Sequence, residues 1–216
     1  MKLIDLALRH CRLLFDVAVP VRCAACGVHG DQVCTSCRRS LAARPLLVRS
    51  EGGDIPRVSA LGPHCGALRV AVLGLKYRNR LDAAVILGGI LGRKLSMTYD
   101  CVVPVPLHDR RLAIRGYNQA EAIARGIART SARDVVTDAL VRVRPTHAQS
   151  SLALAERAEN VANAFALGRT AVRLRDRRVL LVDDVVTTGA TVGACAQALR
   201  EAGIGALHVA ALAIRL

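Results

Sequence analysis

VLLVDDVVTTGAT, residues 179–191, is the most informative stretch of this sequence. Four apolar residues run directly into two adjacent acids, Asp183 and Asp184, and Thr-Thr-Gly follows after two valines. A buried strand does not normally end on two carboxylates without a reason, because burying an unpaired carboxylate is costly. In an open parallel α/β sheet, ligands bind beyond the carboxyl ends of the strands, and we expect this acid pair to lie there.

The residues after the acids predict a phosphate site at the start of a helix over 190–203. A helix N-terminus offers N–H groups and a partial positive charge, Gly189 lets the backbone come close, and threonine hydroxyls add donors. The acids would repel a phosphate, but they suit hydroxyl groups or hydrated magnesium. The motif therefore predicts a ligand such as ribose 5-phosphate, and a plain N-cap and turn is the alternative for Thr-Thr-Gly.

From residue 58 onward, expected strands alternate with expected helices, which is typical of an α/β fold with a parallel sheet and helices on both faces. The expected strands cover 58–64, 101–106, 139–143, 178–184 and 204–214. The expected helices cover 66–80, 81–95, 118–132, 152–165 and 190–203. The longest apolar run, 83–92, is too short to span a bilayer, so we expect a cytoplasmic protein without membrane insertion.

Four cysteines near the N-terminus form two CxxC pairs in CAACGVHGDQVCTSC. The pairs are Cys23 with Cys26 and Cys34 with Cys37, and seven residues separate them. This spacing lets four thiolates converge on one structural zinc ion, whereas redox dithiols or free thiols are the alternatives. In so small a module the zinc would supply most of the folding free energy.

The polar stretch SEGGDIP, residues 50–56, is the preferred boundary between two modules. Residues 1–50 would hold a short amphipathic helix over 3–15 and the four cysteines, and residues 58–216 would form the α/β domain. The four remaining cysteines lack a CxxC partner, and we expect them to be buried or half-buried thiols.

The chain is strongly basic, with 31 Lys and Arg against 17 acids and a formal net charge of +14. This charge indicates a polyanionic partner, such as phosphate esters or nucleic acid, or a general preference for arginine. The sequence has no Trp, three Tyr and two Phe, which disfavours a platform for stacking single-stranded bases. Contact with DNA would show itself as a linear fall of log affinity with log salt concentration.

The stretch VLLVDDVVTTGAT resembles the phosphoribosyl pyrophosphate (PRPP) binding motif of type I phosphoribosyltransferases. RRLAIRGYNQAEAIAR (110–125), RPTHAQSSLALAERAENVANAF (144–165) and the four-cysteine module make the whole chain similar to the ComF family. That family is associated with DNA uptake and competence. The resemblance implies a type I phosphoribosyltransferase fold with a small N-terminal zinc ribbon-like module.

The resemblance also implies roles for individual residues. Asp183 and Asp184 would be the catalytic acids at the ribose hydroxyls, with Mg²⁺ bound alongside PRPP. The 5-phosphate would lie on Thr187, Thr188, Gly189, Ala190 and Thr191. VVPVPL (102–107) would face the pyrophosphate, whose charge Arg115, with or without Arg110 and Arg111, would counter. Lys76 is either a surface cation at a helix end or a group that reaches the ligand, and the polar residues Thr146, His147, Gln149, Arg157 and Asn160 would belong to an active-site cover or to a solvated loop.

Two functions remain open at this point. The first is a PRPP-dependent phosphoribosyltransferase with an unknown acceptor. The second is a non-catalytic protein that binds PRPP or a nucleotide and engages DNA or a protein of the competence machinery. A zinc-ribbon nucleic-acid protein with a vestigial phosphate loop is a third and weaker reading. The scarcity of aromatic residues for stacking an acceptor base favours an unusual acceptor, or none.

Overall fold

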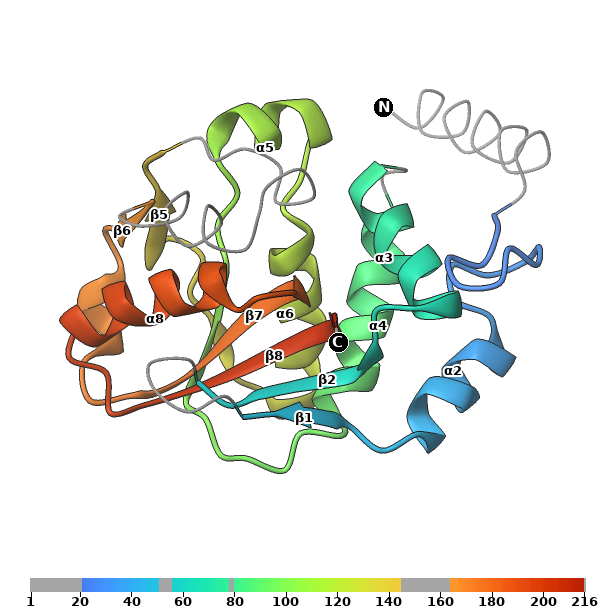
Figure 1. Ribbon diagram of the computed structural model, residues 1–216, viewed down its shortest axis with the longest axis horizontal. Helices are drawn as coiled ribbons and strands as arrows, with labels where there is room; N and C mark the ends of the chain where they lie inside the picture. Colours follow the sequence, from blue (N-terminus) through green and yellow to red (C-terminus); the bar gives the residue numbers. More distant parts are fainter. Residues whose placement is uncertain (1–20, 51–55, 78–79, 145–163, 216) are drawn as a thin grey trace, which may run out of the picture.

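The computed structural model describes residues 21–50, 56–77, 80–144 and 164–215, and it centres on a six-stranded sheet (Figure 1). The strand order is β1-β2-β8-β7-β3-β4. These strands are β1 (Leu47–Arg49), β2 (Val58–Pro63), β3 (Cys101–Pro104), β4 (Asp134–Val135), β7 (Arg178–Val186) and β8 (Ala206–Ile214). All neighbouring pairs are parallel except β1 and β2, which confirms the expected α/β class.

Helices cover both faces of this sheet (Figure 1). They are α3 (Gly66–Tyr77), α4 (Leu81–Gly92) and α6 (Gln119–Ser131) on one face and α8 (Ala190–Glu201) on the other. Helix α2 (Thr35–Ala43) packs on α4 instead, and α5 (Asp109–Arg115) has no buried residue. Successive side chains of a strand point to opposite faces. Leu180 and Val182 of β7 accordingly join the core under α3, α4 and α6, whereas Val179 and Leu181 join the core under α8. Among the described helices, none is long and apolar enough to cross a membrane.

A second, two-stranded sheet lies outside the main one and consists of β5 (Leu140–Arg142) and β6 (Phe165–Leu167). The strand expected over 139–143 therefore forms, but it pairs antiparallel to β6 and does not join the parallel sheet. Leu140 and Phe165 are buried in the core beneath α8, and this burial holds the pair of strands in place. The helix expected over 3–15 lies outside the described residues. The helix expected over 152–165 also lies outside them except for its last two residues, and the last of these, Phe165, begins β6.

The four-cysteine region packs on the α/β domain and shares its core. Leu41 of α2 and Val33 belong to the same buried cluster as α3, α4 and α6. Beyond α2, strand β1 pairs with β2 and places Leu47 opposite Ala60. Thus residues 47–49, which precede the boundary proposed at 50–56, form part of the main sheet.

The crossing of α4 and α6 depends on glycines. A Cβ added to Gly126 would lie 2.2 Å from the Val85 carbonyl oxygen, and one added to Gly88 would lie 2.2 Å from that of Ile123. Both contacts are with backbone atoms, so the two helices would have to move apart. The small residues therefore set the close approach of α4 and α6 beneath the sheet.

We expect Gly126→Ala to lower the free energy of unfolding by about 1–3 kcal/mol or more, because the added methyl group overpacks this crossing. Urea denaturation followed by circular dichroism measures the change. Gly193→Ala in α8 is the matched control, because nothing lies within 4 Å of its added Cβ and alanine favours a helix by about 1 kcal/mol. Equal effects of the two substitutions would contradict the role assigned to the crossing.

Candidate functional site

The acid pair lies near the carboxyl end of β7, on the wall of a cavity of about 450 Å³ that we call the acid cavity. The Asp184 residue is only 4% exposed, and Asp183 is half-buried. The cavity walls also carry other residues that the sequence analysis selected, among them Lys76, Arg111, Arg115, Thr187 and Thr191. The structure therefore brings together residues that are widely separated in the sequence.

Both carboxylate oxygens of Asp184 have protein partners. Lys76 Nζ, at the end of α3, lies 3.1 Å from Oδ1, and Gln119 Nε2 donates a hydrogen bond to Oδ2 at 3.0 Å. Lys76 is thus an ion-pair partner of Asp184, which explains how this carboxylate is buried. Its contact with a phosphate stays a prediction.

The segment Asn118–Gln119 was not selected from the sequence, although it lies within the quoted stretch 110–125. Asn118 is the N-cap of α6, and its Oδ1 accepts a hydrogen bond from Ala120 N. Its Nδ2 donates to the Val105 carbonyl oxygen, which ties the loop after β3 to the start of α6. Asparagine is a favoured N-cap residue, so Asn118 could be recognised in the sequence. The burial of Gln119, which is only 4% exposed, is seen only in the fold.

Asp183 has a different environment from its neighbour. Burial at the cavity wall raises the pKa of Asp183 to about 7, and the Asp184 charge adds to this effect while Lys76 opposes it. The carboxyl is therefore close to half-protonated near neutral pH without a ligand. A bound cation or a ring of hydroxyl donors would favour its ionised form.

The raised pKa of Asp183 predicts that the stability of the ligand-free protein depends on pH. Because the pKa of Asp183 is higher in the folded state, the folded protein holds a proton that the unfolded chain releases above about pH 4. Stability is then lost as the pH rises from about 4 to about 7, and the loss is complete above that range. Asp183→Asn removes this loss, so its melting temperature should increasingly exceed that of the wild type up to about pH 7. Thermal unfolding at a series of pH values measures the gap, and a gap that is constant from pH 4 to pH 8 would contradict the shift.

The loop after the acids leads into α8 through Gly189, whose φ of +80° is left-handed and would strain any other residue. Thr188 Oγ1 accepts a hydrogen bond from Ala190 N at 3.4 Å. Arg49 of β1 donates to the Thr187 carbonyl oxygen at 2.7 Å and so ties the loop to the N-terminal part of the chain. Thr187 and Thr191 line the acid cavity, and Thr188, Gly189 and Ala190 form the turn between them.

Basic side chains outnumber acids around the acid cavity. Its described walls carry the two aspartates and five cations, which are Lys76, Arg111, Arg115, Arg142 and Arg215. Arg111 and Arg115 lie one helical turn apart on α5 and both face the cavity, whereas Arg110 is exposed and is not among the lining residues. Arg142, at the end of β5, packs over the Phe165 ring at 5.2 Å. Neither Arg142 nor Arg215 was selected from the sequence, because only the fold brings their strand ends to the cavity.

The predicted cover residues Thr146, His147, Gln149, Arg157 and Asn160 fall within 145–163, outside the described residues. Strand β5 precedes this segment in the chain, and β6 follows it. Because Arg142 of β5 lines the acid cavity, the chain leaves and re-enters the described structure beside the site. The role of the five predicted cover residues therefore stays a prediction.

The cysteine cluster has the geometry of a metal site. The sulfur atoms of Cys23, Cys26, Cys34 and Cys37 all lie within 4.8 Å of one another. Cys26 Sγ and Cys34 Sγ are 3.7 Å apart, close to the roughly 3.8 Å expected for two thiolates on a tetrahedral zinc ion. Four thiolates therefore fit a closed, structural site, and the cluster could bind a metal such as zinc.

The backbone around Cys23 favours the thiolate form of this cysteine. Gly27, with a φ of +77°, turns the first CxxC knuckle, and Cys34 N donates to Cys23 Sγ at 3.3 Å. Burial raises the pKa of Cys23, but backbone hydrogen bonds led by that from Cys34 outweigh it and lower the value to about 6. Outside the cluster, Cys101 and Cys195 are buried as expected, and Cys11 lies outside the described residues. The expectation was wrong for Cys65, which is exposed because it lies at the turn between β2 and α3.

Comparison with known proteins gives a match to the phosphoribosyl transferase domain over residues 82–215. The chain is 36% identical over 114 residues to Competence protein F of Haemophilus influenzae, an alignment that covers 53% of this chain and half of that protein. It is 29% identical over 217 residues to DNA utilization protein YhgH of Salmonella typhi, covering 94% of this chain and 91% of that protein. A solved structure of glutamine PRPP amidotransferase from B. subtilis, complexed with ADP and GMP, matches 61% of this chain and 26% of its own length, with 22% identity and a TM-score of 0.44.

The domain match spans the acid pair, the threonine loop and α5, which all contribute to the acid cavity, whereas Lys76 of α3 precedes it. The relatives named Competence protein F and DNA utilization protein YhgH agree with the resemblance to the ComF family. The chain belongs to the phosphoribosyl transferase domain family.

Proposed function

We propose that this protein binds PRPP in the acid cavity and transfers its phosphoribosyl group to an acceptor, with release of pyrophosphate. The observation that carries the proposal is the convergence of three features on one cavity. The acid pair, the threonines of the loop before α8 and a set of cations from separate elements all line it. A ligand with a diol between a phosphate and a pyrophosphate matches this order of groups.

In this proposal Asp183 and Asp184 accept hydrogen bonds from the ribose hydroxyls. Lys76 and Gln119 hold the Asp184 carboxylate in one orientation, so it does not need to reorganise when ribose binds. Gln119 Oε1 is buried and, among the described residues, has no hydrogen-bond partner. Because an unsatisfied buried acceptor is costly, a ligand hydroxyl near Gln119 would restore the missing bond.

The 5-phosphate would lie on the loop from Thr187 to Thr191. The left-handed Gly189 turns the backbone into the first turn of α8, where N–H groups and the helix dipole favour an anion. The hydroxyls of the threonines add donors.

The pyrophosphate would face the cations of the acid cavity, chiefly Arg111 and Arg115 of α5. Guanidinium groups pair with phosphate oxygens through two parallel hydrogen bonds. Carboxylate and phosphate oxygens are the hard donors that magnesium prefers, so Asp183 and the pyrophosphate would hold Mg²⁺. When bound, the metal would neutralise charge on the leaving group.

The reaction breaks the bond between the anomeric carbon and pyrophosphate, and its electron pair leaves with pyrophosphate. Positive charge then develops on the ribose ring, beside the two aspartates, while negative charge develops beside the arginines. Fixed charges that match both changes stabilise the transition state without reorganisation. The site therefore has the electrostatic layout that this transfer requires.

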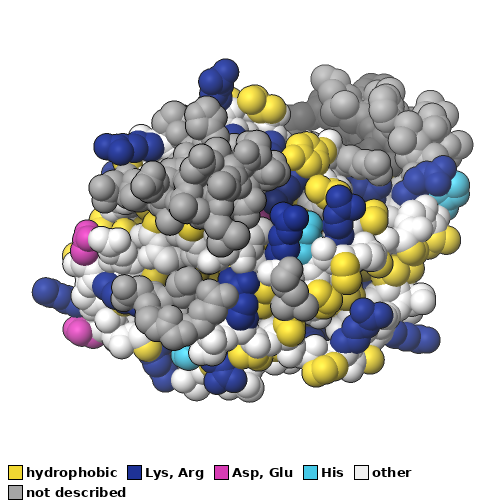
Figure 2. All heavy atoms as spheres, in the orientation of Figure 1, with side chains coloured by type: hydrophobic (Ala, Val, Ile, Leu, Met, Phe, Trp, Pro, Cys, Tyr) yellow, Lys and Arg dark blue, Asp and Glu magenta, His cyan; other side chains and the backbone are white. Residues whose placement is uncertain are grey.

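The names of the relatives Competence protein F and DNA utilization protein YhgH support a role in competence or DNA utilization, which we propose for this chain as well. Figure 2 shows many Lys and Arg side chains and few acids on one face of the molecule, spread out over that face. This distribution agrees with the net charge of +14 and with contact to a polyanion. Contact with a polyanion would be additional to PRPP binding and would not depend on transfer of the phosphoribosyl group.

The direct test is calorimetric titration of PRPP with Mg²⁺ into the full-length, metal-loaded protein. We expect binding in the micromolar range, and weaker binding of ribose 5-phosphate because it lacks the pyrophosphate that faces the arginines. Absence of PRPP binding at millimolar concentration would overturn the proposal. Release of pyrophosphate in the presence of candidate acceptors then separates catalysis from binding alone.

A further inference from the structure

His64 lines the acid cavity, and it is the only histidine among the described residues that do so. It follows β2 directly, and its backbone N–H donates a hydrogen bond to the Ile214 carbonyl oxygen of β8 at 2.7 Å. This bond fixes His64 at the carboxyl edge of the main sheet, where the acid pair also lies. The proposed contacts with PRPP leave the His64 side chain unassigned.

Arg215 brings a second basic side chain to the same edge of the sheet. It follows β8, its N–H donates to the Val186 carbonyl oxygen of β7 at 2.9 Å, and its side chain lines the acid cavity. Strands β2, β8 and β7 are neighbours in the sheet, and Thr187 follows Val186 directly. The ends of β2 and β8 therefore place His64 and Arg215 beside the strand that leads into the phosphate loop.

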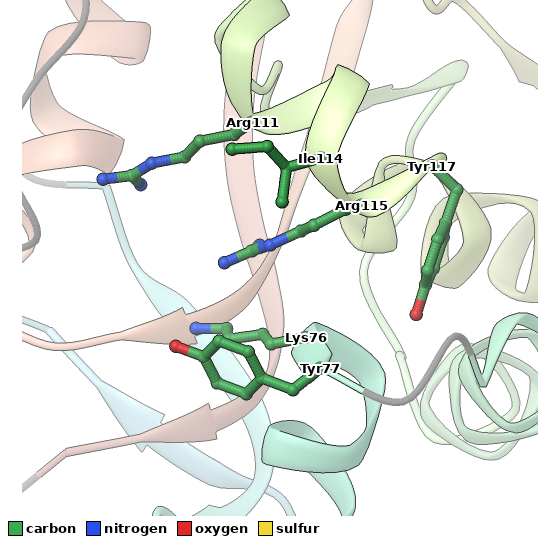
Figure 3. A pocket seen from close by; sticks show the side chains of 6 residues that line it. All are labelled: Lys76, Tyr77, Arg111, Ile114, Arg115 and Tyr117. Atoms are coloured by element: carbon green, nitrogen blue, oxygen red, sulfur yellow. The ribbon is translucent and has the colours of Figure 1, made fainter.

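These two residues are separate from the cations at the ends of α3 and α5. A cleft of about 390 Å³ lies between those helix ends, and Figure 3 shows the charged ends of Lys76, Arg111 and Arg115 pointing the same way, away from Tyr117. Neither His64 nor Arg215 lines that cleft, although both line the acid cavity. The acid cavity thus contains basic groups that the proposed pyrophosphate contacts do not use.

The imidazole of His64 has no hydrogen-bond or ion-pair partner among the described residues. Four charged groups from three elements act on it, and they are Lys76, Arg69, Asp184 and Arg215. Burial lowers the pKa of His64, the three cations lower it further, and the Asp184 carboxylate opposes them. The ring is therefore neutral at pH 7 in the ligand-free protein.

A phosphorylated ligand reverses this balance of charge. PRPP brings several negative charges into the cavity, and an anion beside an imidazole favours the protonated ring. Both ring nitrogens of the protonated form are donors, and a hydrogen bond between two charged groups is roughly twice as strong as a neutral one. The cavity would then gain a cation only when an anion is present, so the empty protein does not hold a further half-buried charge.

We infer that His64 is a phosphate-binding residue of the acid cavity that takes up a proton when a phosphorylated ligand binds. The inference rests on the proposed function, because it requires a phosphorylated ligand in this cavity. The shared chemistry is a phosphate group, which is either the 5-phosphate on the adjacent loop or the pyrophosphate. The proton comes from solvent and returns to it when the ligand leaves, and no covalent bond of the ligand changes in this step.

The direction of the pH effect follows from linkage. Because His64 holds its proton more tightly in the complex, its contribution to affinity is complete at low pH and is lost as the pH rises through its pKa in the complex. Asp183 acts in the opposite direction, since a bound cation favours its ionised form, and a phosphate monoester loses a proton near pH 6. Comparison of the wild type with a His64 variant at each pH removes both of these effects.

The experiment is calorimetric titration of PRPP with Mg²⁺ into the full-length, metal-loaded wild type and His64→Gln between pH 6.5 and pH 8.5. We expect the variant to bind roughly tenfold more weakly at pH 6.5 and within about twofold at pH 8.5. Titration in buffers of different ionisation enthalpy counts protons, and the wild type should take up most of one proton more than His64→Gln at pH 6.5. His64→Lys, which carries a permanent charge, should bind more tightly than the wild type at pH 8.5.

His29→Gln is the matched control, because this imidazole is exposed in the cysteine region and does not line the acid cavity. We expect its affinity and proton uptake to equal those of the wild type at every pH. Ribose 5-phosphate and inorganic pyrophosphate, titrated separately, locate the contact. The probe whose affinity depends on His64 carries the phosphate group that the imidazole meets.

An affinity ratio between wild type and His64→Gln that is the same at pH 6.5 and pH 8.5 would overturn the inference, because a purely structural role has no such pH dependence. Equal proton uptake by the two proteins would also overturn it. If His64→Gln does not fold, His64→Lys replaces it, and an affinity that stays equal to that of the wild type at both pH values contradicts the inference. Failure of the wild type to bind PRPP at all overturns the proposed function instead.

Discussion

The Asp183→Asn/Asp184→Asn double variant is expected to bind PRPP with Mg²⁺ roughly 100-fold more weakly than the wild type. Hydrogen bonds to a charged group contribute about 1.5–3 kcal/mol each, against about 1 kcal/mol for a neutral one. Loss of both charges should therefore cost about 3 kcal/mol, which is about two factors of ten in affinity. Calorimetric titration of both proteins at pH 8, where Asp183 is ionised in the wild type, measures the difference.

The substitution to asparagine preserves the shape of both side chains, so folding should be retained. Asp134→Asn/Asp138→Asn is the matched control, because it removes the same charge at two exposed positions away from the acid cavity. If the control loses as much affinity as the acid-pair variant, the effect is one of net charge. If the acid-pair variant binds PRPP like the wild type, the ribose does not lie on this pair.

Removal of metal from the cysteine cluster is expected to have the largest effect on stability. Zinc binding contributes on the order of 10 kcal/mol to the folding of zinc-finger peptides at neutral pH. The region around the cluster has few buried apolar side chains, chiefly Val33 and Leu41. Apolar burial therefore contributes little to its stability. We expect one zinc ion per chain by metal analysis, and loss of both the metal and the N-terminal structure in Cys34→Ser/Cys37→Ser or after strong chelation.

This loss should reach the acid cavity. The cysteine region leads through α2 into β1, and Arg49 of β1 donates a hydrogen bond to the Thr187 carbonyl oxygen. Metal removal is therefore expected to weaken PRPP binding as well as stability. Cys65→Ser is the control, since this exposed thiol is not part of the cluster and should leave both zinc content and stability unchanged. Full zinc content in Cys34→Ser/Cys37→Ser, or PRPP affinity unaffected by chelation, would contradict these expectations.

Local sequence patterns were sufficient to predict most of the main sheet and its helices. The strand over 178–184 was recognisable because its buried residues are contiguous and apolar, as a central parallel strand requires. The helices over 118–132 and 190–203 were recognisable from the period of their apolar residues, and the second also from Gly203 at its end. The cysteine spacing was likewise local, since each CxxC knuckle places its own two ligands. These features depend on neighbours within a few residues, which a sequence displays directly.

Contacts between distant residues were not accessible in this way. Gln119 and Asp184 are 65 residues apart, and nothing around Gln119 indicates that α6 will bring its amide to the end of β7. The antiparallel pairing of β1 and the separate pairing of β5 with β6 also depend on where the rest of the chain leaves an edge or a face uncovered.

The acid pair and the threonine loop could therefore be read from residues 179–191 alone, because a single strand, turn and helix hold them. Composition showed only that tyrosine is rare. It took the fold to bring Tyr77 at the end of α3 and Tyr117 after α5 to one cleft beside the acids. The periodicity of apolar residues and the spacing of motif residues are properties of neighbouring positions, so the sequence shows them directly. The surroundings of the acid pair depend instead on packing between elements that are far apart in the sequence.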